Sequence, residues 1–185
     1  MTAPAPRLAT YDDLLQLPDN VVGEIVNGQL VTSPRPGPAH AVTAMGLSIS
    51  VGSPFYFGNG GPGGWVILGE PELHLGSDIL VPDLAGWRLE RMPNRPSEAY
   101  FTLAPDWVCE ILSPSTARFD RVEKMPIYAQ NQVPFLWLVE PSARTLEAYA
   151  LEGARWILLG AHGGDQVVKV VPFEAVAIEL GRLWG

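Results

Sequence analysis

Apolar residues along the chain come in short runs divided by glycine, proline and polar residues, which is typical of a domain that mixes strands with a few helices. The runs at 65–68 and 72–75 indicate one interrupted strand or two short strands. A buried core strand is expected at 107–112, and three final runs predict an antiparallel set that closes the domain. The remaining predicted elements are strands at 79–84, 135–139, 145–151 and 156–159 and a short element at 173–183.

Two early segments carry turn and cap signals. Thr10 precedes Tyr11-Asp12-Asp13 and predicts the N-cap of a short helix, since acidic residues are favourable in a first helical turn. Asn27-Gly28 lies between two apolar runs, and this dipeptide supplies the positive φ angles of a type I′ turn. Residues 23–31 are therefore predicted to form a β-hairpin.

Two longer helices are expected. Residues 39–52 space small and apolar side chains along one helical face, with His40 in the first turn, and this helix should pack closely on a sheet. A second helix is expected over 119–129, after Ser113-Pro114-Ser115-Thr116. Pro126 lacks a backbone N–H group, so it should bend or restart that helix.

Two carboxylates stand in or at the end of apolar runs. Asp83 follows Val81-Pro82, and Glu110 lies within 107–112. A buried unpaired carboxylate is costly, so it neutralises, pairs or binds a cation, and oxygen ligands suit Mg²⁺. Lys124, on the following helix, could orient or deprotonate a water or stabilise charge on a phosphate. The alternative is a structural ion pair between Glu110 and Lys124 or Arg121.

Length and composition limit the class of protein. With 185 residues, the chain is expected to be one domain over 1–185. Cys109 has no cysteine partner, which fits a reducing cytoplasm. Residues 1–6 do not resemble a signal peptide, and no run is apolar enough to span a membrane, so a soluble cytoplasmic protein is expected.

The charge balance bears on partners. Twelve basic and 20 acidic residues leave a net charge of −8, which disfavours non-specific attraction to nucleic acid. Acidic nucleases nevertheless bind DNA through local basic patches and bound cations. Arginines that flank the two carboxylate segments could form such a patch: Arg88, Arg91, Arg95, Arg118 and Arg121.

The chain resembles the Uma-two family of putative restriction endonucleases, within the PD-(D/E)XK nuclease superfamily. The resemblance spans about residues 11–151, and its most specific part is Glu110-Ile111-Leu112-Ser113-Pro114-Ser115-Thr116. Further matching residues are those of 23–30, Pro38-Ala39-His40, Val81-Pro82-Asp83-Leu84, Asp120, Lys124, Tyr128 and 136–141.

The resemblance implies an α/β (α+β) fold with a restriction-endonuclease-like core, in which helices flank a mixed central sheet. It implies Mg²⁺, or Mn²⁺ in its place, held by Asp83, Glu110 and Ile111. Lysine two residues after the second acid is the superfamily pattern, but Leu112 stands there, so the catalytic lysine maps to Lys124. Glu24 matches an early glutamate of the family and is expected to be a further ligand or an orienting residue.

The leading functional prediction is a Mg²⁺-dependent endonuclease that hydrolyses DNA. An inactive module that binds nucleic acid or protein, and a metal-dependent hydrolase of small phosphate esters, remain open alternatives. The chain is 47% hydrophobic with six tryptophans and only 17% charged residues, which predicts a homodimer. Its interface is expected to contain aromatic residues from the closing strands or Trp184.

Overall fold

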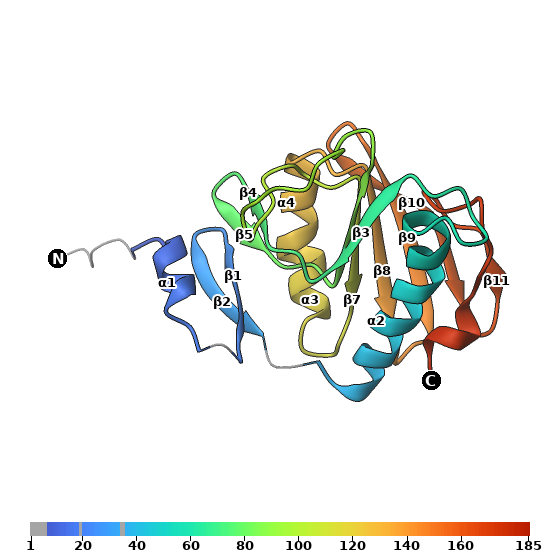
Figure 1. Cartoon of the computed structure of the whole chain (residues 1–185). Coiled ribbons are helices and arrows are strands. Elements are labelled where there is room, and N and C mark those ends of the chain that lie inside the picture. Colours follow the sequence, from blue (N-terminus) through green and yellow to red (C-terminus); the bar gives the residue numbers. More distant parts are fainter. Residues whose placement is uncertain (1–6, 19, 34–35) are drawn as a thin grey trace.

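A computed structural model describes residues 7–18, 20–33 and 36–185 and contains a six-stranded mixed central sheet (Figure 1). The strand order is β10-β9-β8-β7-β6-β3, with β7 and β8 parallel and the other neighbours antiparallel. This arrangement confirms the predicted mixed sheet. The strands are β3 (Trp65–Gly69), β6 (Leu84–Arg88), β7 (Trp107–Ile111), β8 (Phe135–Glu140), β9 (Thr145–Glu152) and β10 (Arg155–Gly163).

A second sheet of four strands lies beside the central sheet, at the left of Figure 1. Its order is β2-β1-β5-β4, and its first two strands form the predicted hairpin. Asn27 and Gly28 have φ angles of 51° and 74°, as a type I′ turn requires. The strands are β1 (Val22–Val26), β2 (Gln29–Ser33), β4 (Leu73–Leu75) and β5 (Asp78–Leu80).

Helices cover both faces of the central sheet. Helix α2 (Pro38–Val51) runs into a π-helical turn, η1 (Gly52–Tyr56), and its buried residues join a core cluster with Trp107 and Trp137. On the other face a continuous helical segment contributes Ile127 and Tyr128 to a second cluster. That segment consists of α3 (Ala117–Phe119), the π-helical turn η2 (Asp120–Lys124) and α4 (Met125–Gln130). Helix α1 (Tyr11–Leu15) begins after Thr10, as predicted.

The alternation of side chains along β7 decides which way Glu110 faces. Trp107, Cys109 and Ile111 belong to the cluster under α2, whereas Val108 belongs to the cluster under α4. Glu110 follows Val108 by two residues, so both side chains lie on the face covered by α4, and Cys109 lies on the opposite face. The same strand thus separates the carboxylate from the thiol.

The predicted strand over 79–84 is wrong, because the structure divides it between two sheets. Strand β5 ends at Leu80 and β6 begins at Leu84, with Val81-Pro82-Asp83 between them. Pro82 has no N–H group to continue a ladder, and the N–H group of Val81 donates to the side chain of Glu24. Asp83 consequently stands just before β6, where its carbonyl oxygen accepts the N–H group of Glu70.

The carboxyl-terminal region forms a small two-stranded sheet, β11 (Val167–Val168) with β12 (Ile178–Glu179), and a 3₁₀ helix, η3 (Leu180–Leu183). Within the part of the chain that the structure describes, no helix has the length and apolar character needed to cross a bilayer. Residues 1–6, for which no signal peptide was predicted, lie outside the described residues.

Candidate functional site

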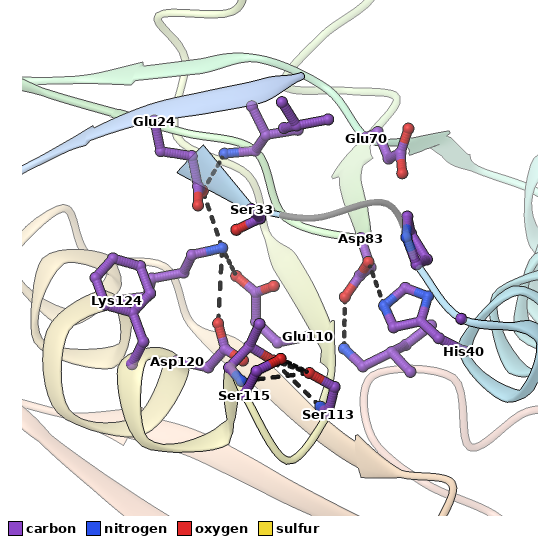
Figure 2. A pocket seen from close by; sticks show the side chains of 17 residues that line it. Glu24, Ser33, His40, Glu70, Asp83, Glu110, Ser113, Ser115, Asp120 and Lys124 are labelled. Carbon is purple, nitrogen blue, oxygen red and sulfur yellow. Dashed lines mark hydrogen bonds and ion pairs between the residues drawn. The ribbon is translucent and has the colours of Figure 1, made fainter. Parts of the chain in front are cut away.

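A pocket of about 190 Å³ opens where the β1–β2 hairpin, the first turn of α2, the end of β7 and the start of α3 meet. Figure 2 shows the carboxylates of Glu24, Asp83, Glu110 and Asp120 around it. Glu110 is the second-last residue of β7, and Asp83 directly precedes β6, the strand that pairs with β7. The structure therefore brings the two sequence-predicted acids into one pocket.

Asp83 is held by partners from two elements. One carboxylate oxygen accepts the backbone N–H group of Ile111 at 2.6 Å, and the other lies 2.9 Å from Nε2 of His40. Burial lowers the pKa of His40, but the hydrogen bond and the charge of Asp83 outweigh it and raise that pKa above its ordinary value. The carboxylate is thus oriented from β7 and α2 together.

Glu110 is almost completely buried and has two partners on the helical segment. The hydroxyl group of Tyr128 donates to its Oε1 at 2.6 Å, and Nζ of Lys124 lies 3.3 Å from the same oxygen. Burial raises the pKa of Glu110 well above its usual range, and Lys124 opposes part of that rise. A cation beside this carboxylate would stabilise its charged form.

Lys124 is the centre of the charged cluster. Its Nζ lies 2.9 Å from Glu24, 3.3 Å from Glu110 and 3.7 Å from Asp120. Burial disfavours the ammonium, yet the surrounding carboxylates raise the pKa of Lys124 above its ordinary value, so it remains charged. Because the turn η2 buries both Asp120 and Lys124, the two side chains point into the pocket together.

Glu24 joins the smaller sheet to this cluster. Its Oε1 accepts the N–H group of Val81 at 2.7 Å and also contacts the ammonium of Lys124. Only 3% of Glu24 is exposed, although it lies on a hairpin strand where an exposed position was equally consistent with the sequence. It therefore fixes both the segment before Asp83 and the lysine.

The negative charges in the pocket outnumber the fixed positive charge. Lys124 faces three carboxylates, and burial raises the pKa of Asp120 to about 6. Across residues 7–18, 20–33 and 36–185, no three His, Cys, Asp or Glu side chains gather as a ready-made metal cluster. A cation would have to be held by one or two carboxylates, which is how Mg²⁺ is usually bound.

The sequence assigned no individual role to several residues in or beside the pocket. Glu70 lines the pocket from the end of β3 and has a positive φ of 48°, which no local pattern indicates. Tyr128 matches the family pattern, and its contact with Glu110 could have been expected because it lies one helical turn after Lys124. Ser113, Ser115 and Thr116 line the mouth, and their hydroxyl groups form a hydrogen-bonded set.

The arginines do not line this pocket among the residues described. Arg88 lies at the far end of β6 from Asp83, with its guanidinium over the ring of Trp65. Arg91 forms an ion pair with Asp106, and Arg121 with Glu147. Among the residues that the structure describes, the positive charge inside the pocket therefore comes from Lys124 and, when it is protonated, from His40.

Comparison with known proteins gives a family and a fold. The sequence model of a family described as "Uma2: Putative restriction endonuclease" matches residues 9–181. A crystal structure of a putative nuclease belonging to DUF820 from Anabaena variabilis ATCC 29413 superimposes with a TM-score of 0.75 at 21% identity. The alignment covers 95% of this chain and 97% of that one. Curated proteins include no match to this sequence.

Proposed function

We propose, because this chain belongs to the Uma2 family of putative restriction endonucleases, that it is a divalent-metal-dependent enzyme that hydrolyses phosphodiester bonds of DNA. The observation that carries the proposal is the meeting of Asp83, Glu110 and Lys124 in one pocket. Two acids and a lysine from three different elements provide the groups that phosphodiester hydrolysis needs. An ion pair alone would need neither Asp83 nor an opening to solvent.

The residues present fit a hard cation. Asp83 and Glu110 offer carboxylate oxygens. Ile111 could add only its backbone carbonyl oxygen, because its side chain has no atom that binds a metal. Burial raises the pKa of Glu110 well above its usual range, so a cation beside it would favour its charged form. When bound, Mg²⁺ would polarise the phosphoryl group and lower the pKa of a bound water.

The chain's own groups then have distinct tasks. Lys124 stays protonated between three carboxylates, so it is suited to stabilise charge on the phosphate and poorly suited to remove a proton. His40 and the N–H group of Ile111 hold the carboxylate of Asp83 in position. Glu24 acts as a positioning residue, because it holds Lys124 and the N–H group of Val81 at once.

The test uses two near-isosteric variants of the acids, Asp83→Asn and Glu110→Gln. Asp106→Asn is the matched control, because Asp106 is also a buried acid of this sheet but pairs with Arg91 at the other end of β7. Each protein is assayed with plasmid, single-stranded DNA, RNA and a nitrophenyl phosphodiester, with Mg²⁺ or Mn²⁺. Calorimetry measures binding of the metal alone.

Both pocket variants should lose at least about 100-fold in cleavage rate and most metal affinity, while Asp106→Asn keeps both. Metal binding that survives in both variants would reject the assigned ligands. Turnover of the nitrophenyl ester without any cleavage of DNA would favour the small-ester hydrolase. Absence of turnover on every substrate would favour a binding module.

A further inference from the structure

Residues 36–69 contain no Asp, Glu, Lys or Arg, and all 32 charged residues of the chain lie outside this segment. This charge-free segment includes the whole of α2 and η1 and ends with β3. The exposed face of a surface helix normally carries charged or polar residues. Helix α2 lies on the outside of the central sheet in Figure 1, yet its exposed face carries large apolar side chains.

The two faces of α2 differ in what covers them. Its inner face carries Thr43, Leu47 and Val51, which are fully buried, and the hydroxyl group of Thr43 donates to the carbonyl of Leu183 at 2.7 Å. Its outer face carries apolar side chains at the spacing i, i+3 and i+7. These are Val42, Met45 and Ile49, with exposed fractions of 43%, 62% and 60%.

We infer that this outer face, Val42, Met45 and Ile49, is the contact surface for a second copy of the same chain. The two copies of α2 pack antiparallel about a two-fold axis that passes near Met45, the middle residue of the stripe. Such a contact is isologous, so each residue of the stripe meets the same stripe on the other copy. Ala41 and Ala44 beside the stripe allow the helices a close approach.

The distribution of charge favours a second copy as the occupant. Each chain carries a net charge of −8, so two copies repel each other wherever their acidic surfaces meet. The stripe itself carries no charged side chain into the contact, and the acids Glu70 and Asp83 line the groove beside it. A basic partner would instead be attracted to the acidic surfaces, and it would gain nothing from α2.

The contact also bears on the candidate site. A groove runs from the pocket along α2, lined by His40, Ala41 and Met45 on the helix and by Asp83 across from them. His40 and Asp83 line both the groove and the pocket. A second α2 beside Met45 covers this groove, so each copy would form part of the wall next to the other copy's Asp83. The inference does not depend on the proposed nuclease activity.

A competing apolar surface lies on the edge strand β10. Ile157, Leu158 and Leu159 are 38%, 51% and 48% exposed, and they belong to the closing strands expected from the sequence to form the interface. Trp184, the other residue expected there, packs on its own core and donates to the carbonyl of Gly164. Leu158 therefore provides the matched control for Met45.

The first experiment measures mass by light scattering for wild type, Met45→Glu, Met45→Lys and Leu158→Glu over a dilution series. Wild type and Leu158→Glu should have twice the 20.1 kDa chain mass at micromolar concentration. Each Met45 variant alone should be monomeric, because two like charges would meet at the axis. An equimolar mixture of Met45→Glu and Met45→Lys should restore the dimer, which also shows that both variants fold.

A second experiment uses cross-linking. Cys109 is completely buried, so a cysteine at Met45→Cys would be the accessible thiol of the protein. Mild oxidation should link Met45→Cys into a disulfide dimer and leave Leu158→Cys monomeric. A monomeric wild type, a dimer lost in Leu158→Glu but kept in both Met45 variants, or cross-linking confined to Leu158→Cys would overturn the inference.

Discussion

Four buried or nearly buried carboxylates share the pocket with one lysine, and this excess of negative charge dominates the chemistry at the scale of residues. Removing one partner of a buried ion pair costs about 3 to 5 kcal/mol, because the other charge is left uncompensated. Lys124 compensates part of the charge of Glu24, Glu110 and Asp120. The remainder favours uptake of a proton or a cation.

The titration of Asp120 reports this excess of negative charge in the absence of a metal. Its pKa is about 6 in the folded chain, raised by burial, and about 3.9 in an unfolded chain. A carboxyl group with a raised folded pKa contributes stability that is fully present below about pH 3.9 and is lost as the pH rises through about 6. In EDTA, the unfolding free energy of wild type relative to Asp120→Asn should therefore fall by roughly 2 to 3 kcal/mol between pH 4 and pH 8.

Urea denaturation of the two proteins measures that difference, and an NMR titration of the Asp120 carboxyl carbon measures its midpoint directly. A midpoint near 4 would contradict the burial-induced shift. A free-energy difference that stays constant with pH would contradict it as well.

At the scale of elements, the break between β5 and β6 positions the first acid. Glu24 on β1 supplies the acceptor that the N–H group of Val81 would otherwise have found in a ladder. Asp83 follows that break, and its carboxylate reaches the N–H group of Ile111 on β7. Three strands from two sheets thus determine where one carboxylate points.

Glu24→Ala should loosen this break. The change leaves the N–H group of Val81 without an acceptor and removes the carboxylate nearest to the ammonium of Lys124. It should cost about 3 to 5 kcal/mol in unfolding free energy. Glu24→Gln keeps an oxygen for Val81 and should cost less. Hydrogen exchange separates the two variants: the Val81 amide should lose its protection in Glu24→Ala and keep most of it in Glu24→Gln. Equal protection in both would refute the clamping role of Glu24.

At the scale of the whole molecule, the central sheet has one core cluster on each face, and β7 and β8 contribute to both. The smaller sheet belongs to one of them through Val26, Leu73 and Leu80. Because the two sheets share a core, neither should unfold alone.

We therefore expect the chain to unfold as one domain. Tryptophan fluorescence reports the central sheet, through Trp87, Trp107 and Trp137, while far-ultraviolet circular dichroism reports both sheets. The two unfolding curves in urea should coincide at each protein concentration. An earlier transition seen by circular dichroism alone would show that the smaller sheet is a separate unit.

The sequence by itself determined the features that depend on neighbouring residues. Asn27-Gly28 predicted its turn, Thr10 its helix cap, and the apolar run around Glu110 a buried strand, because caps, turns and alternation act over a few residues. The placement of Asp83 and Glu110 in apolar runs also predicted that they share a site. Their roles as metal ligands, like those of Lys124 and Ile111, stay predictions.

Only the tertiary structure decided how those residues are paired. The division of 79–84 between two sheets, the contact of His40 with Asp83 and the three carboxylates around Lys124 all join segments far apart in the chain. Their geometry depends on how the sheets and helices pack, which local propensity does not specify. The tertiary structure also decided which face of α2 is exposed. Residues 42, 45 and 49 form a surface only because residues 43, 47 and 51 are buried against the core.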